Sequence, residues 1–192
     1  EVRFLIDGEF SRNLEPVDVV LGFDDLTGYE ENTCYIGATI GRYANRIDHA
    51  KCLIDGQSLH LEANEGVSQL HGGPAGFNRR VFSAKQAGES AVAFTCLSPG
   101  GEGGFPGNLE LRVTYALTER TLSLHYVAVC DRTTYCNITN HSYFNLNGGG
   151  DATHHRLWLA ASRYTPVGLD SIPIAMSRPV AGTPFDFTAE KT

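Results

Sequence analysis

The chain of 192 residues is long enough for one domain with a sizeable core, and 42% hydrophobic with 19% charged residues is an ordinary globular composition. A formal net charge of −7, with no basic run longer than Arg79–Arg80, excludes the basic surface that nucleic-acid binding requires. No apolar run approaches the roughly 18 residues of a membrane-spanning helix, so we expect no membrane partner.

The cysteines form an odd set without any C-x-x-C pair: Cys34, Cys52, Cys96, Cys130 and Cys136. This arrangement argues against a disulfide framework and against a structural zinc site. The sequence therefore predicts reduced thiols, as in a cytoplasmic protein.

Strand patterns dominate the chain, and glycine-, proline- and asparagine-rich connections separate them. No segment keeps an i, i+3, i+4 apolar pattern for three turns, so we expect an all-β antiparallel sandwich or barrel. Strands are predicted at Val17–Phe23, Lys51–Leu61, Ala91–Leu97, Asn108–Leu117, Thr121–Val129, Tyr135–Leu146 and Arg156–Ala161.

The clearest pair of strands is Asn108–Leu117 with Thr121–Val129. Both alternate apolar and polar residues, and the link Thr118–Thr121 is short enough for a tight hairpin. From Thr165 onward the chain is rich in proline and poor in strand signals, which indicates a long extended connection.

The stretch IGRYANRI carries two arginines four residues apart, Arg42 and Arg46, with Asn45 beside the second. Asparagine and arginine together suit hydrogen bonding to sugar hydroxyls or to a carboxylate. A surface ion pair or a buried structural arginine explains the same residues equally well. His71, in LHGG, precedes two glycines that let the backbone bend and expose the imidazole, although such a histidine is more often structural than catalytic.

The glycine-rich segment Gly101–Gly107 has neither a G-K-[ST] ending nor a following helix, so it does not fit phosphate binding. We expect a turn with positive φ at several glycines instead. The pair His154-His155, with Asp151 as the nearest acid, invites a metal hypothesis. Adjacent residues of a strand point to opposite faces, so we expect no metal site.

The segment TNHSYFNL, Thr139–Leu146, is the strongest candidate site. On a strand, His141, Tyr143 and Asn145 would share one face that is unusually polar for an interior strand. Burying such groups is costly unless a partner or a ligand satisfies them. A polar cleft with aromatic rings suits a carbohydrate, but a core histidine satisfied by protein groups has about equal weight.

Six motifs follow one another along the chain: DVVLGFDDLTGY, IGATIGRYANRI, LHGGPAGFNRRVF, SPGGEGGFPGNLELRVTYAL, TNHSYFNLNG and PVAGTPFDF. The series resembles the aldose 1-epimerase (galactose mutarotase) family over nearly the whole chain. The resemblance implies a large antiparallel β-sandwich of the galactose mutarotase type, as a single domain over residues 1–192. It also implies interconversion of the α and β anomers of hexoses such as galactose and glucose, without a cofactor.

The resemblance also implies roles for individual residues. His141 is implied as the general acid, and His71 as a residue that hydrogen-bonds the sugar near its ring oxygen. Asn45 and Arg46 are implied as substrate contacts, and Ser142 and Tyr143 flank the acid. Opening a hemiacetal requires removing the C1 hydroxyl proton while protonating the ring oxygen, which suits a histidine acid and a carboxylate base.

The family's catalytic base is a glutamate that follows the PVAGTPFDF motif, and Glu190 lies too close to that motif to match it. The strands before DVVLGFDD are also largely absent, and the chain begins with Glu1 rather than methionine. We therefore expect a partial domain, incomplete at both ends. The alternatives are a catalytically inactive relative that at most binds hexoses, and a β-sandwich with a structural role only.

Overall fold

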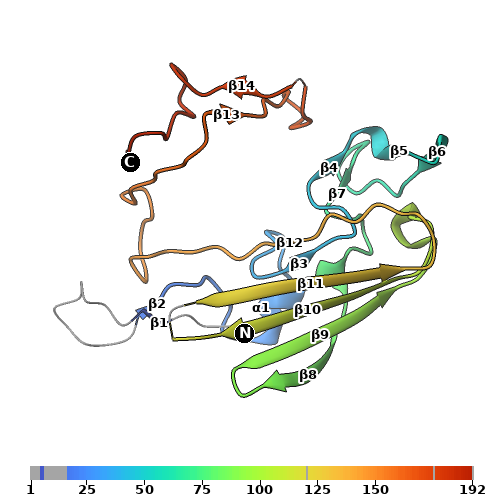
Figure 1. Cartoon of the computed structure of the whole chain (residues 1–192), viewed down its shortest axis with the longest axis horizontal. Helices are drawn as coiled ribbons and strands as arrows, with labels where there is room; N and C mark the ends of the chain where they lie inside the picture. Colours follow the sequence, from blue (N-terminus) through green and yellow to red (C-terminus); the bar gives the residue numbers. More distant parts are fainter. Residues whose placement is uncertain (1–4, 7–16, 120, 175, 192) are drawn as a thin grey trace. The chain divides into compact units, whose positions relative to one another are not determined.

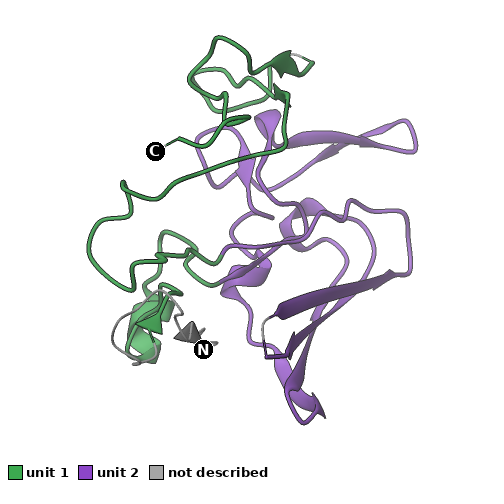
Figure 2. Ribbon diagram, turned by 60° about the vertical axis from the view of Figure 1, so that its left-hand side comes forward, with its two compact units in different colours: residues 1–37, 142–192 green, residues 38–141 purple. Residues whose placement is uncertain are grey.

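The computed structural model describes residues 5–6, 17–119, 121–174 and 176–191. The chain divides into two compact units (Figure 2): residues 1–37 with 142–192 form unit 1, and residues 38–141 form unit 2. The single domain over residues 1–192 stays a prediction.

Unit 2 contains a four-stranded antiparallel sheet with the strand order β11-β10-β9-β8 (Figure 1). Its strands are β8 (Ser83–Gly88), β9 (Ala91–Ser98), β10 (Leu109–Leu117) and β11 (Leu122–Cys130). The predicted hairpin is confirmed, because β10 and β11 pair from Leu109↔Cys130 to Leu117↔Leu122. The Thr118 N–H donates to the Thr121 carbonyl at 2.9 Å and closes the turn.

The alternation along β10 builds the main core of unit 2. Leu109, Leu111 and Val113 are buried, whereas Glu110 and Arg112 between them are exposed. Phe77 and Cys96 complete this cluster, and partly buried side chains pack against it: Phe82, Tyr115, Tyr126 and Ile138. Burying one face of an antiparallel sheet while the other faces water is the arrangement that such alternation predicts.

Shorter strand pairs form the rest of unit 2. They are β3 (Thr39–Ile40) with β12 (Thr139–Asn140), β4 (Arg46–Ile47) with β7 (Gln69–Leu70), and β5 (Lys51–Ile54) with β6 (Gln57–His60). Three 3-10 turns accompany them: η1 (Asp48–Ala50), η2 (Phe77–Arg79) and η3 (Glu102–Gly104). Ala50, Leu61 and Phe105 form a second core in this region, and partly buried side chains pack against it: Tyr43, Ile47, Cys52 and Tyr135.

Several predicted strands were wrong in extent. Lys51–Leu61 is a hairpin rather than one strand, because Asp55 and Gly56 adopt φ values of 51° and 77° and reverse the chain. Strand β8 was not predicted, since all its residues are exposed and no apolar alternation marks it. The three other long predictions are borne out only in part. Residues 17–23 retain β2 (Val17–Asp18) and a bridge at Val20, residues 135–146 retain β12 and bridges at Asn137 and Phe144, and residues 156–161 retain the bridge Leu157↔Lys191.

Unit 1 has little regular structure. It contains the antiparallel pairs β1 (Leu5–Ile6) with β2, and β13 (Arg163–Tyr164) with β14 (Arg178–Pro179), together with the short helix α1 (Leu26–Glu30). The Asp25 carboxylate caps α1 by accepting the Gly28 N–H at 3.0 Å. Within the described ranges, no helix is both long and apolar enough to cross a membrane.

Candidate functional site

His71 and His141 meet in unit 2. Their ring centroids are 5.4 Å apart, and the rings are nearly perpendicular at 84°. β12 pairs with β3, and one residue further the His141 N–H donates to the Ala38 carbonyl at 2.9 Å. The Asn140 amide donates to the Tyr115 hydroxyl at 3.3 Å, which ties this segment to the main sheet. The fold therefore fixes the backbone that carries His141.

The strand pair β4–β7 positions His71 opposite Asn45. Arg46 pairs with Leu70, and just beyond them the His71 N–H donates to the Asn45 carbonyl at 3.1 Å. The Asn45 N–H donates to Nδ1 of His71 at 3.0 Å. Both residues have positive φ, 57° at His71 and 70° at Asn45, so the chain turns sharply here. Because Nδ1 accepts a hydrogen bond, the proton of the neutral imidazole lies on Nε2.

The surroundings of His71 keep it neutral. Burial, then the charges of His141 and Arg46, lower the pKa of His71 to about 4, and Glu65 acts in the opposite direction. A second positive charge beside His141 is disfavoured, since like charges at short range oppose each other's ionisation. At neutral pH His71 is thus a hydrogen-bond donor through Nε2 rather than an acid.

Gly72 lets the His71 loop pack directly against β3 and its extension. Its φ is +90°, and a Cβ at this position would lie 1.9 Å from the Gly41 carbonyl oxygen. Only glycine fits so close an approach of two backbones. The prediction that the two glycines bend the chain is confirmed, although the imidazole of His71 is partly buried rather than exposed.

The two arginines of IGRYANRI have different partners. Arg46 forms a bidentate ion pair with Glu65, with Nε to Oε2 at 2.5 Å and Nη2 to Oε1 at 2.7 Å. Its Nη1 also donates to Oδ1 of Asn45 at 3.3 Å. Asn45 and Arg46 therefore lie together at the edge of the His71 loop. Sequence reasoning missed Glu65, because it lies 19 residues from Arg46 and no local spacing marks it.

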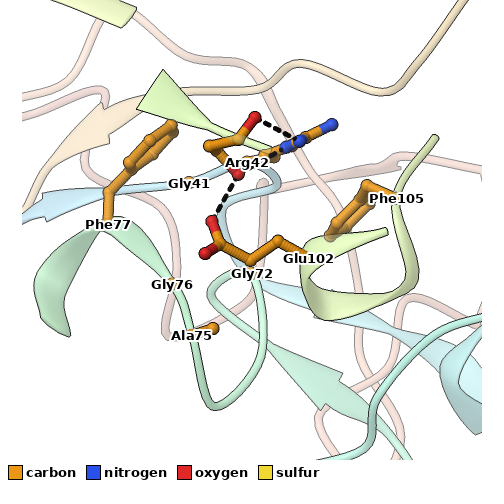
Figure 3. Close-up of a pocket in the computed structure, with 9 residues that line it drawn as sticks. Gly41, Arg42, Gly72, Ala75, Gly76, Phe77, Glu102 and Phe105 are labelled. Atoms are coloured by element: carbon orange, nitrogen blue, oxygen red, sulfur yellow. Dashed lines mark hydrogen bonds between the residues drawn. The ribbon is translucent and has the colours of Figure 1, made fainter. Parts of the chain in front are cut away.

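Arg42 is a buried structural residue, with an exposed fraction of 3%. Its guanidinium donates to the carbonyls of Ser98, Pro99, Pro106 and Gly107 and to the Ser98 hydroxyl, at 2.8 to 3.0 Å. The Ser98 hydroxyl in turn donates to Glu102 at 2.5 Å (Figure 3). Burial lowers the pKa of Arg42, and the nearby Glu102 carboxylate opposes that effect.

The glycine-rich segment is the loop that Arg42 holds. Gly101, Gly103, Gly104 and Gly107 all have positive φ, so the predicted turn is confirmed. The Gly103 carbonyl accepts hydrogen bonds from the Gln69 side chain at 2.8 Å and from the Glu62 N–H at 3.1 Å. The loop thus supports β7, the strand that leads into His71. A small pocket lies between this loop and the His71 loop and is lined by Gly41, Arg42, Gly72, Ala75, Gly76, Phe77, Ser98, Glu102 and Phe105 (Figure 3).

Ser142 and Tyr143 belong to unit 1. The expected shared face of His141, Tyr143 and Asn145 is wrong, because the strand ends at Asn140, and Tyr143 is exposed whereas Asn145 is buried. The Tyr143 hydroxyl donates to the Cys34 carbonyl at 3.2 Å. The roles of Ser142 and Tyr143 toward a substrate stay predictions.

The histidine pair at 154–155 does not join a metal-binding group. In the part of the chain that the structure describes, no three His, Cys, Asp or Glu side chains gather in a way that could hold a metal ion. The His155 N–H donates to the Ala152 carbonyl at 3.1 Å, and the Asp151 carboxylate accepts the Thr153 N–H at 2.7 Å. This segment is a local turn.

The structure thus defines an antiparallel β protein with two histidines and an Asn-Arg pair gathered at one site. The family model described as aldose 1-epimerase matches residues 9–192, and the chain belongs to this family. It is 40% identical over 178 residues to aldose 1-epimerase of Haemophilus influenzae, covering 91% of this chain and 52% of that protein. It is 44% identical over 171 residues to galactose mutarotase of Rattus norvegicus, covering 88% and 50%.

Solved structures agree with this assignment. The GalM/aldose epimerase homologue from C. elegans superposes with a TM-score of 0.89 at 33% identity, over 94% of this chain and 56% of that one. Galactose 1-epimerase from Lactobacillus acidophilus gives 0.85 at 31% identity, over 93% and 54%. The predicted mutarotase-type fold is confirmed. The chain spans about half the length of the curated relatives it matches.

Proposed function

We propose that the protein is an aldose 1-epimerase, which interconverts the α and β anomers of hexoses such as galactose and glucose. Family membership and the relatives named above support this activity. The observation that carries the proposal is the contact between His71 and His141 with Asn45 and Arg46 beside it. Such a cluster supplies a proton donor, a neutral hydrogen-bond donor and polar groups for sugar hydroxyls within one unit.

In this proposal the two histidines have different roles: His141 donates a proton, and His71 donates a hydrogen bond. His141, when protonated, donates a proton to the ring oxygen as the bond between C1 and that oxygen breaks, while a base removes the C1 hydroxyl proton. His71 stays neutral and donates a hydrogen bond from Nε2 near the ring oxygen. Rotation about C1–C2 and re-closure on the other face then give the second anomer. Both anomers have the same composition and oxidation state, so the reaction balances without a cofactor.

We assign substrate contacts to Asn45, Arg46, Ser142 and Tyr143, as the family resemblance implies. Amide and guanidinium groups suit the dense donors and acceptors of a hexose. A carboxylate is expected as the base, as in the family. Glu190 is not that base in our proposal, and its carboxylate accepts a hydrogen bond from Arg156 at 2.8 Å. The five free cysteines support a reducing compartment such as the cytoplasm.

Polarimetry of freshly dissolved α-D-galactose tests the proposal. We expect His141→Asn to lower the catalysed mutarotation rate about 10²–10⁴-fold, because it removes the proton donor. His49→Asn is the matched control, since His49 is an exposed histidine of the same unit whose Nδ1 lies 2.7 Å from Asp48, and it should keep the wild-type rate.

The assay should include this chain and, if the gene continues beyond Thr192, the extended chain. Absence of any rate above the uncatalysed background in the longest form would overturn the proposal. Galactose binding by calorimetry without turnover in that form would favour the inactive relative.

A further inference from the structure

Glu65 is fixed by its own turn, independently of Arg46. The Ser68 N–H donates to the Glu65 carbonyl at 3.0 Å, and the Glu65 N–H donates back to the Ser68 carbonyl at 3.1 Å. Gly66, with φ of 59°, occupies the first central position of this two-residue turn. The turn therefore holds the Glu65 backbone whether or not its carboxylate is present.

The Glu65 turn lies along β7. The Asn64 side chain bonds both backbone groups of Leu70, donating to its carbonyl at 3.0 Å and accepting its N–H at 2.7 Å. Leu70 also pairs with Arg46 of β4. Leu70 thus lies between β4 and the segment that leads into the Glu65 turn, and the Arg46 side chain reaches the Glu65 carboxylate.

The bidentate pair restrains a long side chain at the site. Without this pair Arg46 would sample several rotamers, because its guanidinium ends a flexible stem. Only 23% of the side chain is exposed. Two parallel N–H···O bonds fix both the position and the plane of the guanidinium. In that orientation Nη1 donates to Oδ1 of Asn45, the residue whose backbone N–H holds the His71 ring.

We propose that Glu65 is a positioning residue of the sugar site, acting through Arg46 to hold its guanidinium beside Asn45 in the orientation that contacts the hexose. The inference rests on the proposed function, because it assigns to Glu65 a part in substrate binding. The carboxylate takes no part in proton transfer. Its effect should therefore appear in binding and disappear when the Arg46 guanidinium is absent.

A double-mutant cycle tests this dependence. Glu65→Gln keeps the size of the side chain and removes its charge, and Arg46→Met keeps the stem and removes the guanidinium. We expect Glu65→Gln to raise KM for galactose about 3–10-fold with kcat within about twofold, since the lost interaction serves ground and transition states alike. In the Arg46→Met background the same change should have no further effect. Glu65→Asp, which retains the charge, should fall between Glu65→Gln and the wild type.

Glu190→Gln is the matched control. It breaks another Arg–Glu pair, Arg156 with Glu190 at 2.8 Å in unit 1, and should leave KM unchanged. Equal losses from Glu65→Gln in the presence and absence of the Arg46 guanidinium would overturn the proposal, as would a loss confined to kcat.

A measurement without turnover separates this inference from the proposed function. The Nε–H of Arg46, followed by ¹⁵N NMR, should exchange slowly with water in the wild type and at least several-fold faster in Glu65→Gln. Unchanged exchange would overturn the role of Glu65 even if the enzyme is active. Faster exchange together with no mutarotase activity in the longest form of the protein would leave the Glu65–Arg46 coupling standing and overturn the proposed function alone.

Discussion

His71 uses its two ring nitrogens for different purposes. Nδ1 accepts the Asn45 N–H and anchors the ring to the fold, and this contact places the proton of the neutral ring on Nε2. From the sequence, a structural role and a functional role of His71 were alternatives. In the structure one nitrogen serves the fold, and the proposed mechanism uses the other. The family resemblance pointed to Asn45 and His71, but not to the hydrogen bond that joins them, because that bond spans 26 residues.

We predict that His71 titrates far below the usual range of histidine, with a pKa of about 4. Long-range ¹H–¹⁵N NMR should show a neutral ring protonated at Nε2 at pH 7. His141→Gln should raise the pKa of His71 by removing one of its causes, while burial keeps it below 6.5. Titration of His71 near 6.5 in the wild type would contradict the prediction.

The sign for stability follows from the same shift. The unfolded chain protonates His71 near 6.5 and the folded chain near 4, so the unfolded state binds more protons between these values. The free energy of unfolding is therefore expected to fall as the pH drops through this window, and to fall less in His71→Gln. Other groups that titrate in this window act in both proteins, so the difference between the two curves is the quantity to compare.

At the scale of elements, a strand could be predicted from the sequence where one of its faces is buried. A strand without a buried face was not predicted. β10 and β11 were found because alternate residues of β10 enter the core. β8 has no buried residue and leaves no such pattern. The hairpin β5–β6 did carry a signal, the Asp55-Gly56 pair, which is typical of a type I′ turn and was overlooked.

Two glycines offer a sharp test at this scale, because Gly72 and Gly101 have nearly the same φ in different surroundings. Their φ values are +90° and +91°, but a Cβ at Gly72 would meet the Gly41 carbonyl at 1.9 Å, whereas nothing lies within 4 Å at Gly101. We expect Gly101→Ala to cost about 1–2 kcal/mol through backbone strain alone. Gly72→Ala should cost at least about 2 kcal/mol more, measured by urea unfolding. Equal losses would contradict the close approach of the backbones at Gly72 and Gly41.

At the scale of the whole molecule, the candidate site depends on contacts between distant parts of the sequence. Motifs that resemble a family were enough to name the site residues Asn45, Arg46, His71 and His141. The residues that hold them in place could not be named in this way. Glu65 bonds Arg46, 19 positions away, and Ser98 bonds Arg42, 56 positions away. Local propensity and periodicity carry no information on such pairs. The buried Gln69, whose amide donates to Gly103 34 positions away, is a further example.

Arg42 donates to several groups that lie 56 to 65 positions away in the sequence, so its removal tests the framework of unit 2. Arg42→Met would leave the buried carbonyls of Ser98 and Gly107, and the partly buried carbonyl of Pro99, without their guanidinium donor. We expect a loss of about 3–5 kcal/mol in the free energy of unfolding, since each buried acceptor that is left without a donor costs about 1–3 kcal/mol.

Arg112→Met is the matched control, because Arg112 lies on the exposed face of β10 in the same unit. It should change the free energy of unfolding by no more than about 0.5 kcal/mol. Arg42→Lys separates charge from geometry: one ammonium retains the charge, but it offers three donors from a single atom and cannot reproduce the planar fork. It should recover only part of the loss. Full recovery by lysine would mean that the charge beside Glu102, rather than the set of carbonyl bonds, holds the glycine-rich loop beneath the His71 site.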